Sequence, residues 1–137
     1  MTDQDVFTFP DGMMICRALE HEAQNILNDP TVHYREFTPP ASGPDVWLLT
    51  HGKLKALFHA KIDGNRIVDL HIAVPWRSRQ RMVMDRIMNW CHHRGALAAI
   101  TYAPESRVTI CRMLKKLGFQ RIGTKGDEII FFRRLYG

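Results

Sequence analysis

Three strand-like segments in a row, followed by a helix and a further strand, constrain the fold of this chain most. The segments 46–50, 54–62 and 67–74 are short and apolar, and turn-forming residues separate them. The first turn contains Gly52, and the second contains Asp63-Gly64. Asp-Gly between apolar segments is a strong hairpin signal. The sequence therefore predicts three consecutive antiparallel strands.

A helix and a buried strand follow these three segments. Residues 79–94 place apolar side chains on one broad helical face, and Gly95 is suited to end that helix. The run 97–102 is continuously apolar apart from its end, as in a buried strand. Because a helix joins 67–74 to 97–102, these two strands are predicted to be parallel inside a mostly antiparallel sheet.

The two ends of the chain add shorter elements. The start predicts a strand at 6–9 and a helix at 14–28, with Asp11 as a candidate helix cap. Near the other end, Ser106 is a candidate N-cap for a helix that bears Ile110, Met113, Leu114 and Leu117 and is closed by Gly118. The segments 120–124 and 128–133 then form a hairpin. The predicted fold class is α/β (α+β), a mixed and mainly antiparallel sheet flanked by helices.

Length and composition favour one ordinary globular domain spanning residues 1–137. Hydrophobic residues make up 45% of the chain and charged residues 24%. No apolar run approaches the roughly 20 residues that span a bilayer. The acidic start, Met1-Thr2-Asp3-Gln4-Asp5, lacks the order of a signal peptide. We therefore expect a cytoplasmic protein without a membrane partner.

The cysteines do not form a disulfide pattern. Cys16, Cys91 and Cys111 are scattered, and each lies in an apolar stretch that reads as helix. They are predicted to be buried free thiols. Cys91-His92-His93 offers neighbouring ligands that point in different directions on a helix, with no second ligand pair at a suitable spacing. No metal site is predicted.

Positive charge is concentrated in one segment. The net charge is +5, and Arg77, Arg79, Arg81 and Arg86 fall within ten residues. Such a cluster favours an anionic partner, which could be a phosphate-bearing cofactor, nucleic acid or an acidic protein surface. Trp76 could stack on a base in the nucleic-acid case. The cluster is equally well interpreted as a solvated basic loop with no binding role.

The element order resembles that of the GNAT N-acetyltransferase superfamily over nearly the whole chain. Two local signatures carry the resemblance. Ile72-Ala73-Val74-Pro75, followed by an arginine-bearing turn and a helix, is similar to the family's central strand and pyrophosphate loop. The run 110–119 resembles the late helix that ends in K-x-G-F. The chain is also similar to small GNAT-like proteins of tailed bacteriophages, including the internal virion protein group, in having Leu114 where many members have tyrosine.

The resemblance implies acetyl-CoA as cofactor. In the family, backbone N–H groups at a helix N-terminus hold the pyrophosphate, and glycines in an R/Q-x-x-G-x-G/A loop let the backbone approach it. The implied cofactor-binding residues are Ile72, Ala73 and Val74 for the pantetheine, with Arg79, Gln80, Arg81, Met82, Val83 and Met84 for the pyrophosphate. Methionines therefore stand at both glycine positions. Either neighbouring arginines replace the backbone donors, or the fold has lost its cofactor.

The resemblance also suggests which residues would be catalytic. Asp69 or His71 could accept the proton of an amine, and Tyr102 and Glu105 lie near the end of the next strand. Because Leu114 replaces the usual tyrosine, the family's acid is absent. Two functions remain open: an N-acetyltransferase acting on an unidentified amine, or a catalytically inactive structural or host-interaction protein of a phage. The second would have a protein partner and act in the virion or host cytoplasm. The last strand leaves pairing into a homodimer open.

Overall fold

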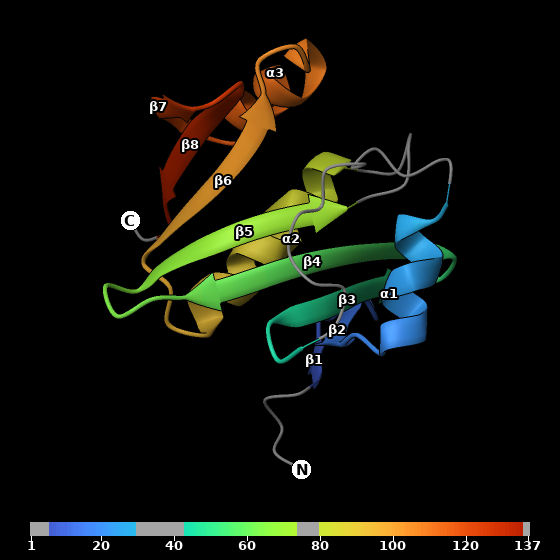
Figure 1. The fold of residues 1–137 in the computed structure, drawn as a ribbon. Coiled ribbons are helices and arrows are strands. Elements are labelled where there is room, and N and C mark those ends of the chain that lie inside the picture. Colours follow the sequence, from blue (N-terminus) through green and yellow to red (C-terminus); the bar gives the residue numbers. More distant parts are fainter. Residues whose placement is uncertain (1–5, 30–42, 74–79, 136–137) are drawn as a thin grey trace. The chain divides into compact units, whose positions relative to one another are not determined.

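The computed structural model describes residues 6–29, 43–73 and 80–135, which form eight strands and three helices. Figure 1 shows these elements in chain order. Their bounds are β1 Val6–Thr8, β2 Met14–Arg17, α1 Glu20–Leu27, β3 Val46–His51, β4 Leu54–Ile62, β5 Ile67–Ala73, α2 Gln80–His93, β6 Ala98–Pro104, α3 Val108–Lys116, β7 Gln120–Lys125 and β8 Glu128–Arg134.

The strands belong to one mixed sheet with the order β1-β2-β3-β4-β5-β6-β8-β7. Strands β5 and β6 are parallel, in a register that pairs Ile67 with Ala98. The pairs β1–β2, β2–β3, β3–β4, β6–β8 and β7–β8 are antiparallel. The predicted fold class and the predicted parallel pair are therefore confirmed.

The chain divides into two compact units, Met1–Ala60 with His71–Val83 and Lys61–Leu70 with Met84–Gly137. In the first unit α1 packs on the sheet (Figure 1). Its Ala23 and Ile26 share a buried cluster with Leu57 and Ala73. Burying such apolar side chains contributes roughly 25 cal/mol per Å² of apolar surface removed from water.

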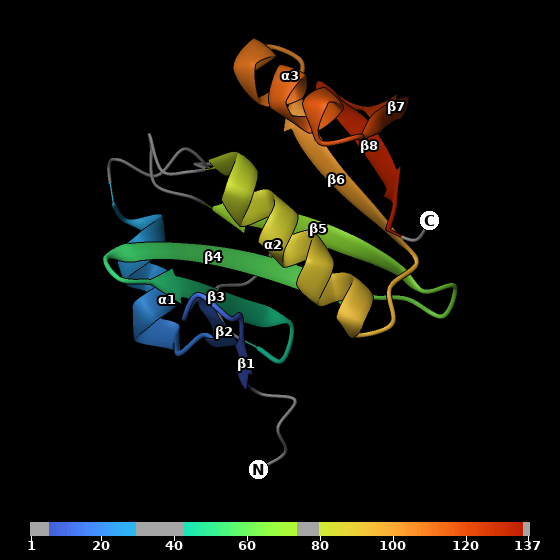
Figure 2. The same ribbon diagram turned by 180° about the vertical axis from the view of Figure 1, so that it is seen from behind.

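The second unit contains β6, α3 and the β7–β8 hairpin. Phe131 of β8 is fully buried, and Leu114, Leu117 and Phe119 bury the apolar side of α3 and the turn that follows it. Figure 2, seen from behind, shows α2 crossing in front of β5. The part of α2 in this unit buries Ile87, Met88, Trp90 and Cys91. No helix in the described part of the chain is both long and apolar enough to cross a membrane.

The predicted helix at 14–28 is wrong in its first six residues. Residues Met14–Arg17 are strand β2, in which Ile15 pairs with both Phe7 and Leu49. Helix α1 begins only at Glu20, where the Glu22 carboxylate accepts a 3.1 Å hydrogen bond from the Leu19 backbone N–H. Pairing on both sides outweighs the local helical periodicity. Cys16 consequently lies on a strand and is half-buried, whereas Cys91 and Cys111 are buried as predicted.

Ser106 does not cap α3. The N-cap residue is Arg107, and no side chain caps the helix. The Arg107 N–H bonds the Pro104 carbonyl at 2.9 Å, so a turn continues from the end of β6 directly into the first turn of the helix. This turn shifts the start of α3 by one residue relative to the prediction.

The turn after β4 forms as the Asp-Gly signal predicts. One carboxylate oxygen of Asp63 accepts hydrogen bonds from the N–H groups of Asn65, at 2.8 Å, and Ile67, at 3.0 Å. Arg66 adopts a left-handed φ of 62°, which is uncommon for a residue with a Cβ. The side chain of Asp63 therefore holds this turn.

Candidate functional site

The pairing between β5 and β6 ends before either strand does. The last paired residues are Leu70 and Thr101, while β5 continues to Ala73 and β6 to Pro104. The Thr101 hydroxyl donates a 3.0 Å hydrogen bond to the Leu70 carbonyl oxygen. Thr101 is only 4% exposed, so this bond satisfies a buried polar group at the last step of the ladder.

Asp69 and Tyr102 lie beside this point. The Tyr102 hydroxyl donates a hydrogen bond of 3.4 Å to Oδ2 of Asp69, which is long for an O–H···O bond. Asp69 is exposed and Tyr102 half-buried. Partial burial raises the pKa of Tyr102, and the charge of Asp69, its acceptor role and the charge of Glu128 raise that pKa further. Tyr102 therefore keeps its proton at neutral pH, which suits a hydrogen-bond donor or a general acid.

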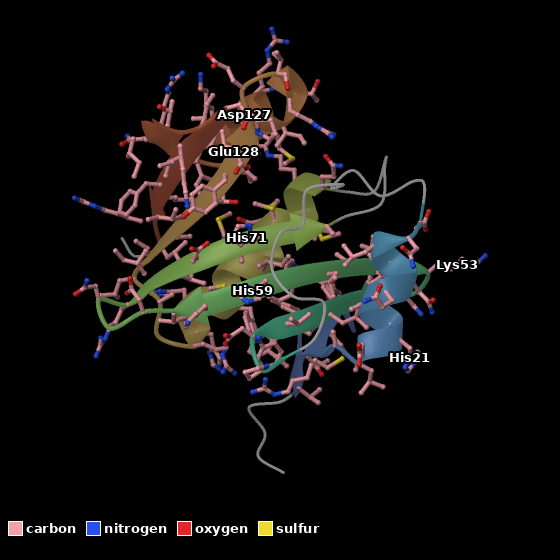
Figure 3. All side chains as sticks on the ribbon, viewed as in Figure 1. His21, Lys53, His59, His71, Asp127 and Glu128 are labelled. Carbon is pink, nitrogen blue, oxygen red and sulfur yellow. The ribbon has the colours of Figure 1, made fainter. Side chains whose placement is uncertain are left out.

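His71, the second predicted catalytic residue, has a partner that the sequence analysis missed. Its ring lies 6.2 Å from the ring of His59, centroid to centroid, in an edge-to-face arrangement at 68°. Figure 3 labels both side chains, on β5 and β4. Both residues are half-buried.

The register of the β4–β5 hairpin, which can be counted from its turn, would have identified His59 as the residue opposite His71. The Asp63 N–H bonds the Ile67 carbonyl at 3.0 Å. Counting four residues outward from each of these two reaches His59 and His71, because residues in an antiparallel hairpin face each other at equal distances from the turn.

The predicted pantetheine residues have side chains that belong to the core. Ile72 is 5% exposed, and Ala73 is fully buried among residues of α1, β3 and β4. Only their backbone groups are left to bind a ligand. Val74 and Arg79 lie outside the described residues, as do Trp76 and Arg77 of the basic cluster.

The start of α2 has mixed exposure. Arg81 is exposed, Gln80 and Met82 are half-buried, and Val83 and Met84 are buried. The first turn contains no acidic side chain. The first N–H groups of a helix have no intrahelical partner and favour an anion, so this turn is compatible with phosphate. Met84 fills space in the core, as expected of methionine on a helix.

Leu114, at the position of the family's tyrosine, is 2% exposed. Its carbonyl accepts a 3.0 Å hydrogen bond from Phe119 N–H, in the turn that closes α3. This position therefore contributes to packing in this protein. Within the described ranges no group of three or more His, Cys, Asp or Glu side chains is arranged to hold a metal ion.

No protein-family model matches this sequence, and no curated protein matches it. Solved structures do match in fold. A ribosomal-protein alanine N-acetyltransferase from Escherichia coli has a TM-score of 0.67 at 15% identity, with 91% of this chain and 95% of that chain covered. An IAA acetyltransferase from Bacillus cereus has a TM-score of 0.65 at 9% identity, covering 90% and 99%.

A third match was solved with a ligand. The PaiA N-acetyltransferase from Thermoplasma acidophilum, in complex with coenzyme A, has a TM-score of 0.56 at 13% identity and covers 65% of this chain and 59% of that one. At these identities the similarity concerns the fold. The chain therefore has the fold of the GNAT N-acetyltransferases.

Proposed function

We propose that this protein is an acetyl-CoA-dependent N-acetyltransferase that acts on an amine. The observation that carries the proposal is the fold, which matches N-acetyltransferase and acetyltransferase structures over 91% and 90% of this chain. The side chains of Ile72 and Ala73 are buried, so in this proposal it is their backbone groups that pair with an extended ligand such as pantetheine, which carries amides of its own.

In this proposal the cofactor is held mainly by backbone groups and arginine side chains. Ile72, Ala73 and Val74 pair with the pantetheine. The first-turn N–H groups of α2, from Gln80 to Met84, face the pyrophosphate, and the guanidinium groups of Arg79 and Arg81 add charge. Guanidinium binds phosphate oxygens in a bidentate manner, which offsets the loss of close backbone approach where glycine is absent.

The proposed chemistry is direct transfer. The amine nitrogen attacks the thioester carbonyl, the bond from carbon to sulfur breaks, and the amide forms. Asp69 or His71 accepts the proton lost by the amine. Tyr102, which keeps its proton at neutral pH, donates to the departing thiolate. Positioning and polarisation of the thioester supply the rest of the rate enhancement.

The first experiment is a thermal-shift and calorimetric titration with acetyl-CoA and CoA. Saturable stabilisation is expected, because a ligand that binds only the folded state raises the melting temperature. The double variant Arg79→Ala plus Arg81→Ala should weaken it. Lys53→Ala plus Lys55→Ala is the matched control, since both lysines are exposed on the β3–β4 hairpin and the loss of charge is equal. Release of CoA thiol with a panel of amines then tests transfer.

A second candidate is a GNAT-like protein without catalysis that binds a protein partner. This candidate is favoured by Leu114 and Met84, which are buried. They stand where the family has its tyrosine acid and a glycine of the pyrophosphate loop. A correctly folded protein that shows no stabilisation at millimolar acetyl-CoA would support this candidate and contradict the enzyme. The bacteriophage origin, the homodimer and a virion location stay predictions.

A further inference from the structure

The second unit contains a pocket that the proposed function does not use. It has a volume of about 450 Å³ and is lined by Gly118, Gln120, Phe132, Arg133 and Arg134. These residues come from the turn after α3, the start of β7 and the end of β8. The volume lies in the usual range for small-molecule sites, about 300 to 1,000 Å³.

The lining combines positive charge with an aromatic ring. Two residues carry guanidinium groups, Gln120 carries an amide, and none of the described residues that line the pocket carries a carboxylate. On the β7–β8 ladder Gln120 pairs with Phe132, and the alternation of the strand places Arg134 on the same face as Phe132 and Arg133 on the opposite face. Gln120 and Arg134 therefore offer hydrogen-bond donors to an anion beside the apolar ring of Phe132.

Packing holds Arg133 at the pocket. Its Nη1 lies 3.3 Å from Sδ of Met88 on α2, and the residue is half-buried. A Cβ built on Gly118 would lie 3.6 Å from Nε of Arg133, so the guanidinium lies against backbone at a position without a side chain.

The surrounding sequence strengthens this positive potential. Residues 105–135 contain eight Lys and Arg residues against three Asp and Glu residues, an excess equal to the net charge of the whole chain. Lys115 and Lys116, in the last turn of α3, offset the negative end of the helix dipole near Gly118. An anion approaching the pocket meets a favourable field over several residues.

The pocket is separate from Tyr102. On β8, Ile130 pairs with Tyr102, whereas Arg134 pairs with Ala98 at the start of β6. Four residues of strand separate Ile130 from Arg134, or about 13 Å at about 3.3 Å per residue. A ligand in the pocket therefore lies toward the other end of β8.

We propose that this pocket binds a small phosphorylated ligand of nucleotide size. Arg134 binds the phosphate oxygens, Gln120 donates a hydrogen bond and Phe132 offers its ring to a planar base, while Arg133 adds positive charge from the other face of β8. The proposal does not depend on acetyl-CoA binding, so the pocket is tested with and without saturating acetyl-CoA.

The test uses ADP, adenosine and inorganic pyrophosphate as probes, followed by amide chemical shifts and calorimetry. ADP is expected to shift the amides of Gly118, Gln120 and Arg133 in a saturable manner, also when acetyl-CoA is present. Adenosine should bind at least about tenfold more weakly than ADP, because it lacks the charge-assisted bonds. Pyrophosphate that binds as tightly as ADP would contradict a contribution from Phe132 and thus the nucleotide assignment.

Two pairs of substitutions locate the site. Arg133→Gln plus Arg134→Gln should weaken ADP binding at least about tenfold. Lys115→Gln plus Lys116→Gln removes the same charge from exposed positions that do not line the pocket, and should weaken binding less than about threefold. If the double variant fails to fold, Arg134→Gln alone replaces it in the comparison, because Arg134 is exposed and its substitution should not disturb the core. Equal weakening in the two pairs, or shifts confined to other amides, would overturn the proposal.

Discussion

The Tyr102 hydroxyl donates its hydrogen bond to Asp69 from a position two residues beyond Ile100, the residue that pairs with Asp69. The contact is therefore diagonal, between side chains on one face of the parallel pair β5–β6. It joins one candidate acid to one candidate base. In the proposed mechanism Tyr102 takes the role of acid, because Leu114 carries no group that could donate a proton.

Tyr102→Phe removes this hydroxyl with little change in volume. If Tyr102 protonates the thiolate, kcat should fall by about 100-fold while the KM for acetyl-CoA stays nearly constant, since general acid catalysis typically contributes about 10² to 10⁴. Thiol release with the amine found in the screen measures both constants. An unchanged kcat, with the melting temperature preserved, would remove Tyr102 from the mechanism.

The raised pKa of Tyr102 also predicts how stability depends on pH. The folded protein holds the phenol proton more tightly than the unfolded chain, in which the pKa is near 10.0. Its contribution to stability is complete below that value and is lost as pH rises through the folded-state pKa. Melting temperatures of the wild type should therefore fall more steeply than those of Tyr102→Phe above about pH 10. Parallel curves would show that the pKa is not raised.

Thr101→Val tests the bond that ends the ladder. The substitution keeps the shape of the side chain and removes the buried hydroxyl that bonds the Leu70 carbonyl, so it should cost about 1 to 2 kcal/mol in urea unfolding. Thr124→Val on β7 is the control, because Thr124 is exposed. The control should change stability by less than about 0.5 kcal/mol. Similar values for the two variants would contradict a special role for Thr101.

Leu114→Tyr restores the residue type that the family has on the late helix. Because Leu114 is 2% exposed, the larger ring must be accommodated in a packed interior, and we expect a loss of about 1 to 3 kcal/mol. No gain in kcat is expected. A variant as stable as the wild type and more active would show that the position faces a reaction site.

The three thiols should differ in reactivity. Burial raises the pKa of Cys91 to about 12 and also raises the pKa values of Cys16 and Cys111. Thiolate is the reactive form, so all three should react slowly, and half-buried Cys16 should react first. Labelling at neutral pH followed by mass spectrometry measures the order. Cys91 should be labelled only as fast as the protein opens, and faster labelling would contradict its burial.

The sequence was informative where local chemistry decides the structure. The carboxylate of Asp63 and the glycine of its turn identify the β4–β5 hairpin, and the helix between β5 and β6 requires a crossover. Ile15 could not be placed in this way, because its strand forms only by pairing with Phe7 and Leu49, and Leu49 lies 34 residues away along the chain. Long-range pairing leaves no local trace when the segment also has helical periodicity.

The candidate site was less predictable than the fold. Asp69 and His71 could be proposed from β5 alone, but the bond from Tyr102 depends on the register of two strands separated by a helix. The buried state of Leu114 depends on packing in the second unit. The lining of the Arg133 pocket comes from three elements, and its arginines form no recognisable motif in the sequence.

The hydroxyl of Thr101 joins two strands that are far apart in the sequence. It bonds the Leu70 carbonyl, 31 residues earlier in the chain, at the last paired step of β5 and β6. The two strands are therefore attached there by a side chain as well as by the backbone. Because the attachment depends on one oxygen atom, a single nucleotide change in the gene is enough to remove it while every loop keeps its length.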